Sequence, residues 1–178
     1  MVDGYVHGFR AAEQERLCDQ AATLTDHLHA DTAYPPGSRV LEPGCGVGAQ
    51  TVELVRRSPG ALVTGVDRSR SSLAAARRRI ADLACDAGRT VTFAEADVYD
   101  LPREAAGDGA LGPERFDHAF VCFLLEHLPR PAEALRRVRR MLVPGGTVTV
   151  IEGDHRSVAF HPDSAAARRV IDCQVRLQ

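Results

Sequence analysis

Residues 40–49 read VLEPGCGVGA, and this stretch decides the fold. It joins a short hydrophobic strand to a turn with glycine at every second position (Gly44, Gly46 and Gly48) and then to a helix. Glycine has no Cβ, so such a turn lets a bound molecule approach the backbone closely. The helix that follows would offer unpaired N–H groups and the positive end of its dipole. Turns of this kind follow the first strand of open parallel α/β sheets, at the edge where ligands bind.

Hydrophobic strands and amphipathic helices alternate along the rest of the chain. The expected strands are residues 39–42, 61–67, 90–94, 116–123 and 147–151, and the expected helices are residues 11–30, 49–57, 70–86, 131–142 and 164–177. Five alternations predict an α/β fold, a Rossmann-like doubly wound parallel sheet. We expect residues 1–37 to form an N-terminal segment and helix that cap the site, and residues 38–178 to form the ligand-binding domain.

Composition narrows the range of functions. A chain of 178 residues is long enough for one domain with a substantial core, and a net charge of −2 gives no overall attraction to nucleic acid or to an anionic membrane. All 22 basic residues are arginine, which excludes mechanisms that need a lysine, such as Schiff-base catalysis.

Cysteine usage and hydropathy bear on the cellular compartment. The five cysteines are scattered without framework spacing, which favours free thiols in a reducing compartment. The N-terminus lacks a hydrophobic signal core, and no apolar run approaches the ~20 residues that span a bilayer. These features predict a cytoplasmic protein with no membrane or nucleic-acid partner.

Three acidic residues stand at the ends of successive expected strands. Glu42 precedes the glycine turn, where a carboxylate would repel a pyrophosphate and attract an ammonium group. Asp67 ends the second strand at the position that binds ribose hydroxyls in such sheets. Asp97 follows the third strand, and with the N–H of Val98 it would suit an adenine. This arrangement favours S-adenosylmethionine over a dinucleotide. The alternatives are that Asp67 caps the next helix and that Asp97 is a surface-turn acid.

Five motifs carry a family resemblance. In order they are LEPGCGVG, GVD, EADVYDLP, FDHAFVCFLLEHLPRP and LVPGGTVTVIEGDH, within residues 38–155. Together they resemble class I S-adenosylmethionine-dependent methyltransferases, and are similar to the group of ubiquinone and menaquinone biosynthesis. The resemblance implies strand order 3-2-1-4-5, helices on both faces of the sheet, and transfer of a methyl group to a small-molecule acceptor.

The resemblance also implies a set of cofactor-binding residues. The glycines would line the methionine part of the cofactor with Glu42 nearby, Asp67 would hold the ribose, and Cys122 would lie beside the sulfonium. The full expected set is Glu42, Gly44, Cys45, Gly46, Gly48, Asp67, Arg68, Asp97, Val98 and Cys122. The alternative for Cys45 is a small filler of the turn, and for Cys122 a buried apolar residue.

Candidates for proton transfer follow the fourth and fifth strands. They are His127, Asp154 and His155. The competing interpretation of His127 is a packed or hydrogen-bonded histidine without a catalytic role. We expect no metal site, because the spacing of His155, His161 and Asp163 matches no ligand motif. His27 and His29 lack partner spacing, and we expect them to be solvated.

Members of the family normally add two antiparallel strands after the fifth, and this sequence shows none. Residues 148–151 would then form an exposed sheet edge, so dimerisation of two identical chains through that edge is a hypothesis. The alternative function is a non-catalytic cofactor-binding or interaction module left by C-terminal shortening. A third, an NAD-dependent oxidoreductase, fits Glu42 poorly.

Overall fold

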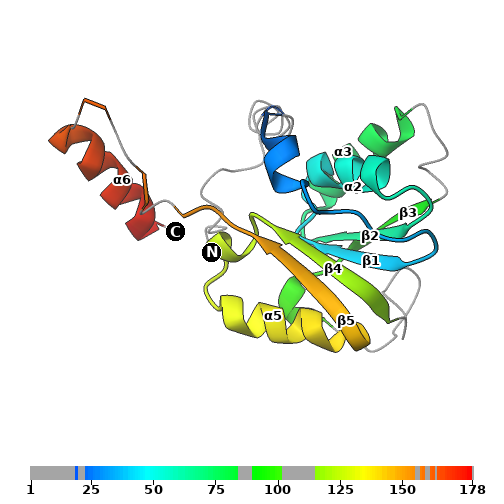
Figure 1. Ribbon diagram of the computed structural model, residues 1–178. Helices are drawn as coiled ribbons and strands as arrows, with labels where there is room; N and C mark the ends of the chain where they lie inside the picture. The colour runs from blue at the N-terminus through cyan, green and yellow to red at the C-terminus, as the bar shows by residue number, and fades with distance from the viewer. Residues whose placement is uncertain are drawn as a thin grey trace.

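The computed structural model describes residues 19, 23–83, 90–101, 115–154, 157–158, 161–162 and 164–177. Its centre is a five-stranded sheet in the order β3-β2-β1-β4-β5, in which every neighbouring pair is parallel (Figure 1). The predicted fold class and strand order are therefore confirmed.

The elements follow the expected alternation of strand and helix. The strands are β1 (Arg39–Pro43), β2 (Leu62–Asp67), β3 (Val91–Glu95), β4 (Phe116–Cys122) and β5 (Leu142–Ile151). The helices are α2 (Ala49–Arg57), α3 (Arg70–Ala81), α5 (Pro131–Arg140) and α6 (Ala165–Leu177), with short 3-10 turns η1 (Val98–Asp100) and η2 (Leu125–His127).

Each face of the sheet has its own hydrophobic core. Successive strand residues point to opposite faces, so Val40 packs with Leu54 of α2 and Ile80 of α3, whereas Leu41 packs with Val138 of α5. Figure 1 shows α2 and α3 on one side of the sheet and α5 on the other. Because both faces are covered, β4, which has a neighbouring strand on each side, is apolar at five of its seven positions.

Two boundaries differ from the prediction by more than two residues. The fifth strand was expected to begin at residue 147, but β5 begins at Leu142 and runs through residues 144–146. The pairing shifts between Phe116 and His118 of β4, and Gly145 adopts φ +83°, which lets the additional residues bulge out of the ladder. Helix α3 ends at Ala81 instead of residue 86, with Asp82 as its C-cap.

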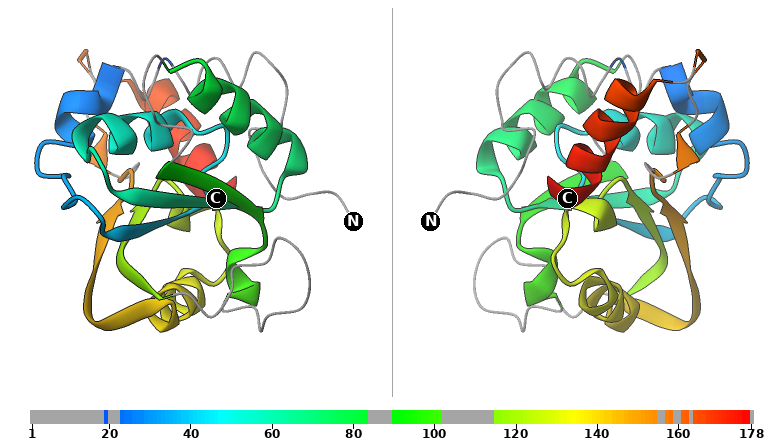
Figure 2. Two further views of the ribbon diagram at one scale, coloured as in Figure 1. Left: turned by 90° about the vertical axis from the view of Figure 1, so that its right-hand side faces the viewer. Right: turned by 90° about the vertical axis from the view of Figure 1, so that its left-hand side faces the viewer.

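The segment before β1 is described from residue 23. Residues 23–28 are helical, and the chain then packs His29 and Tyr34 on the face that α2 covers. The expected N-terminal cap lies mostly outside the described residues. At the other end, α6 stands apart from the sheet body in Figure 1, and in the right-hand view of Figure 2 it lies on the side nearest the viewer.

Candidate functional site

The glycine turn lies between β1 and α2, at the carboxyl edge of the sheet. Gly44, Gly46 and Gly48 have φ of +72°, +53° and +76°, in the left-handed region that side chains other than glycine rarely adopt. The N–H groups of Gly44 and Cys45 donate to the carbonyl oxygen of Val66, at 2.7 and 3.1 Å. These bonds fasten the turn to the end of β2.

The three glycines meet different surroundings. A Cβ on Gly48 would lie 3.0 Å from the Cβ of Ala76 in α3, and a Cβ on Gly44 would lie 2.7 Å from Cδ1 of Leu124. A Cβ on Gly46 would meet nothing within 4 Å. The turn is thus packed against the protein at both ends and is open at its middle, where a ligand would approach the backbone.

Asp67 ends β2 beside this opening. Its Oδ2 accepts a hydrogen bond from the Gly46 N–H at 2.9 Å, and its Oδ1 accepts one from the Ser69 N–H at 2.8 Å. A carboxylate has about four lone-pair sites, so both oxygens can accept further hydrogen bonds. Burial raises the pKa of Asp67, although the two N–H groups oppose the shift. Arg68, the next residue, is exposed.

The alternative interpretation, that Asp67 caps the next helix, is only partly correct. The N-cap of α3 is Ser69, whose hydroxyl accepts from the Ser72 N–H at 3.2 Å. Asp67 supports that cap from outside the helix and at the same time holds the middle of the glycine turn.

Glu42 lies beneath the turn. It is 3% exposed, and its Oε2 accepts a hydrogen bond from the Thr51 hydroxyl at 2.6 Å. Burial, together with nearby Asp67, raises the pKa of Glu42 to about 8. From the sequence, Glu42 was expected to be a charged group facing the ligand. In the structure it is a buried carboxyl group whose charge depends on pH and on any cation bound above it.

The two cysteines of the expected set are shielded. Cys45 is buried within the turn, and this burial raises the pKa of its thiol far above the usual range. Cys122 is half-buried at the end of β4, and burial raises its pKa to about 12. Both thiols stay protonated at neutral pH, which agrees with the alternative interpretations of small filler and packing residue.

Asp97 and Val98 follow β3. Asp97 Oδ1 accepts from the Tyr99 N–H at 2.9 Å and so begins η1, while Val98 is buried. The Tyr99 hydroxyl accepts from the Arg130 N–H at 3.0 Å, and the Arg130 guanidinium lies 4.7 Å from the Tyr99 ring centroid. The adenine side of the expected site is therefore joined to the start of α5.

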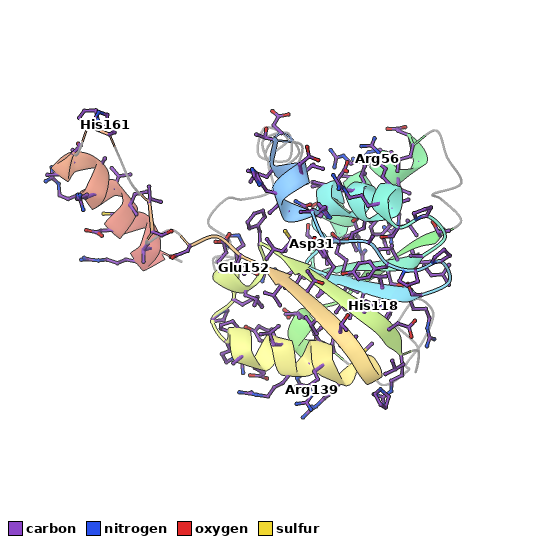
Figure 3. The ribbon with its side chains drawn as sticks, viewed as in Figure 1. Asp31, Arg56, His118, Arg139, Glu152 and His161 are labelled. Atoms are coloured by element: carbon purple, nitrogen blue, oxygen red, sulfur yellow. The ribbon has the colours of Figure 1, made fainter. Side chains whose placement is uncertain are left out.

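The segment after β4 is held from β5. Phe123 has φ +52°, a conformation that costs on the order of 1–3 kcal/mol for a residue other than glycine. The Glu152 carboxylate accepts backbone N–H groups of Leu124, Leu125 and Glu126 at 3.1, 2.8 and 3.3 Å. Burial raises the pKa of Glu152, and the three N–H groups oppose that shift. Figure 3 places Glu152 beside the turn that follows β4.

Two of the three candidate proton-transfer residues, His127 and Asp154, lie in the part of the chain that the structure describes. His127 is half-buried at the end of η2, with its Nε2 3.5 Å from Glu126 Oε1. Asp154 is exposed after β5, and its carbonyl oxygen accepts from the Ser157 hydroxyl at 2.9 Å. His155 lies outside the described residues.

Sequence reasoning missed two partners and misplaced a third residue. The hydrogen bond of Thr51 to Glu42 gave no signal, because it depends on side-chain rotamers. Glu152 belongs to the last of the five motifs, but nothing in the motif indicated its contacts with residues 124–126, which lie far away in the sequence. His29, expected to be solvated, is 1% exposed: it stacks on Phe120 at 5.1 Å, and its Nε2 lies 2.7 Å from Gln50 Oε1. Burial lowers its pKa.

The described residues show neither a metal-binding group nor a membrane-spanning helix. They contain no group of three or more histidine, cysteine, aspartate or glutamate side chains arranged to hold a metal ion. None of the described helices combines the length and the apolar composition needed to cross a membrane.

A parallel sheet with a glycine turn after β1 and an acidic residue at the tip of β2 defines the class of Rossmann-like nucleotide-binding domains. Residues 41–148 match the family described as a methyltransferase domain, and the chain belongs to that family.

The chain is similar to individual curated proteins and solved structures. The chain is 32% identical over 151 residues to a trans-aconitate 2-methyltransferase of Methylobacterium nodulans, covering 85% of this chain and 52% of that protein. The structure of an S-adenosylmethionine-dependent methyltransferase from Aquifex aeolicus matches with a TM-score of 0.64 at 16% identity, covering 94% and 88% of the two chains. The [4+2]-cyclase SpnF matches with a TM-score of 0.54 at 25% identity, covering 83% and 48%. The chain spans no more than about half the length of the curated relatives.

Proposed function

We propose that this chain binds S-adenosyl-L-methionine and transfers its methyl group to a small-molecule acceptor. The observation that carries the proposal is Asp67, whose carboxylate is fixed by two backbone N–H groups beside the open middle of the glycine turn. Two ribose hydroxyls can donate to its remaining lone pairs, and Asp67 would hold the ribose in that way.

The residues at this edge fit that cofactor. Gly46 leaves space above the backbone, and Asp97 with Val98 lies on the neighbouring strand end for the adenine. Glu42 supplies a buried carboxyl group below the turn, where the cofactor's ammonium group would lower its pKa and keep it charged. A dinucleotide has no ammonium group to place there, and its pyrophosphate would instead lie near the acidic Glu42, which disfavours it.

The cofactor supplies an activated methyl group on a positively charged sulfur. What the chain contributes is binding, orientation and exclusion of water: Asp67 and the glycine turn fix the nucleoside, and Leu124 and Cys122 border the end where transfer would occur. Positioning of this kind can contribute up to ~7–11 kcal/mol to lowering a barrier.

For an acceptor that must lose a proton, His127 is the candidate base that the geometry favours. It is half-buried beside Glu126 at the end of η2, in the segment after β4 where the acceptor would bind, whereas Asp154 is exposed. Asp154 and His155 remain predictions for the same role. A general base contributes typically ~10²–10⁴-fold to the rate.

Calorimetry tests the proposal. We expect S-adenosylhomocysteine to bind the wild-type chain and NAD not to bind. A screen of small-molecule acceptors with methyl-labelled S-adenosylmethionine then separates transfer from binding alone. Binding of NAD in preference to S-adenosylhomocysteine would contradict the proposal. Binding of cofactor with no labelled product, against labelling by a longer form of the protein, would favour the alternative of a non-catalytic module.

We also propose that two copies associate through β5, which lies at the edge of the sheet. Val148 and Val150 of this strand are 39% and 44% exposed, and none of the described strands pairs with the outer edge of β5. Sedimentation velocity at increasing concentration should show a dimer, and a monomer throughout would contradict this. A cytoplasmic location remains a proposal based on the cysteine pattern, which fractionation of cells would test.

A further inference from the structure

We infer that Glu152 is a positioning residue for the reacting end of the site, acting through the segment that follows β4. The inference rests on the proposed function and names a residue beyond the expected cofactor set. Glu152 comes directly after β5, and its carboxylate accepts three successive backbone N–H groups, those of Leu124, Leu125 and Glu126.

The segment that Glu152 holds is under backbone constraint. Phe123 adopts φ +52°, and its N–H donates to the Ile151 carbonyl oxygen at 2.9 Å. A residue other than glycine keeps such a conformation only where the surroundings enforce it. Three of the four hydrogen bonds from β5 and Glu152 to residues 123–126 end on the Glu152 carboxylate, so this side chain is the main restraint on the segment.

The segment in turn shapes the glycine turn. Leu124 lies directly against Gly44, since three of its side-chain carbons are 2.7 to 3.2 Å from where a Gly44 Cβ would stand. A shift of Leu124 therefore changes the wall beside the first glycine of the turn. Glu152 acts on that wall through its hydrogen bond to the Leu124 N–H, so it does not need to contact a ligand itself.

The strand order tells which part of the cofactor would be affected. Asp67 and Asp97 follow β2 and β3, so the adenosine part belongs on that side of β1. Gly44 and Leu124 follow β1 and β4, so the amino-acid part extends to the other side. Loss of Glu152 should thus weaken binding of the amino-acid part and leave binding of the adenosine part nearly unchanged.

Two probes separate these parts. S-adenosylhomocysteine carries both, and 5′-methylthioadenosine carries only the adenosine part with its sulfur. For Glu152→Ala we expect calorimetry to show S-adenosylhomocysteine binding weakened about tenfold, and 5′-methylthioadenosine binding changed by less than about twofold. Glu152→Gln should recover most of the loss, because its amide oxygen can accept the Leu124 and Leu125 N–H groups. Asp172→Asn, the same chemical change on exposed α6, is the matched control and should behave as wild type.

The outcomes distinguish the claims. Equal weakening of both probes in Glu152→Ala would mean general loosening and would overturn the inference, as would no weakening of either. Wild-type protein that binds neither probe would contradict the proposed function itself. Hydrogen exchange at the amides of residues 124–126 tests the restraint without any ligand: exchange about tenfold faster in Glu152→Ala is expected, and unchanged exchange would overturn it.

Discussion

The Asp67 carboxylate accepts hydrogen bonds from the N–H groups of Gly46 and Ser69. Its role in binding can be tested by substitution. We expect Asp67→Ala to weaken S-adenosylhomocysteine binding by ~1.5–3 kcal/mol, the value of hydrogen bonds to a charged group. Calorimetry measures the change. Asp82→Ala, which removes an exposed carboxylate at the end of α3, is the control. An unaltered affinity in Asp67→Ala would remove this residue from the ribose site.

The acidic residues of the site have different roles in the structure because their side chains are buried to different extents. Asp67 and Asp97 could be assigned to strand ends from spacing alone, since parallel strands end at a common edge. The burial of Glu42 and its bond to Thr51 could not, because side-chain packing around α2 decides whether that carboxyl group faces inward. The burial of His29 could not be predicted either, because His29 stacks on Phe120, which lies 91 positions further along the chain.

Between β1 and α2, the close contact of Gly48 with Ala76 fixes how the glycine turn meets α3. We expect Gly48→Ala to lower the free energy of unfolding by about 1–2 kcal/mol for its left-handed backbone, and by a further ~1–3 kcal/mol for overpacking against Ala76. Urea denaturation measures the loss.

Gly37 provides a matched control for that substitution. It has φ +81°, but a Cβ there would meet nothing within 4 Å, so Gly37→Ala should show only the backbone cost of about 1–2 kcal/mol. Equal losses in the two variants would contradict the idea that contact between the turn and α3 constrains position 48.

The order and type of the described elements agree with the sequence pattern because the hydrophobic period differs between strand and helix. The predicted start of β5 was wrong by five residues, because the strand begins at Leu142 and not at residue 147. Proline and glycine at 144–146 are ordinary turn signals, and only pairing with β4 turns them into a bulge inside the strand.

For the whole molecule, Glu42 makes stability depend on pH. Its pKa is about 8 in the folded chain against an ordinary value of 4.5, so the folded state binds more protons between these pH values. Its contribution to stability is therefore fully present below pH ~4.5 and is lost as pH rises through about 8. Wild type should lose stability relative to Glu42→Gln over this window.

Denaturant unfolding of both proteins at several pH values measures that difference. His29, whose lowered pKa acts in the opposite direction as pH falls below 6.5, is present in both proteins and cancels in the comparison. Parallel curves for the two proteins would contradict a buried, protonated Glu42.

The measurement that reaches the central claim most directly is a crystal structure of the chain with S-adenosylhomocysteine bound. The account predicts both ribose hydroxyls within hydrogen-bond distance of the Asp67 carboxylate, with the nucleoside over the ends of β2 and β3 and the amino-acid part above Gly46. A ligand bound away from this edge of the sheet, or a ribose that faces a different side chain, would contradict it.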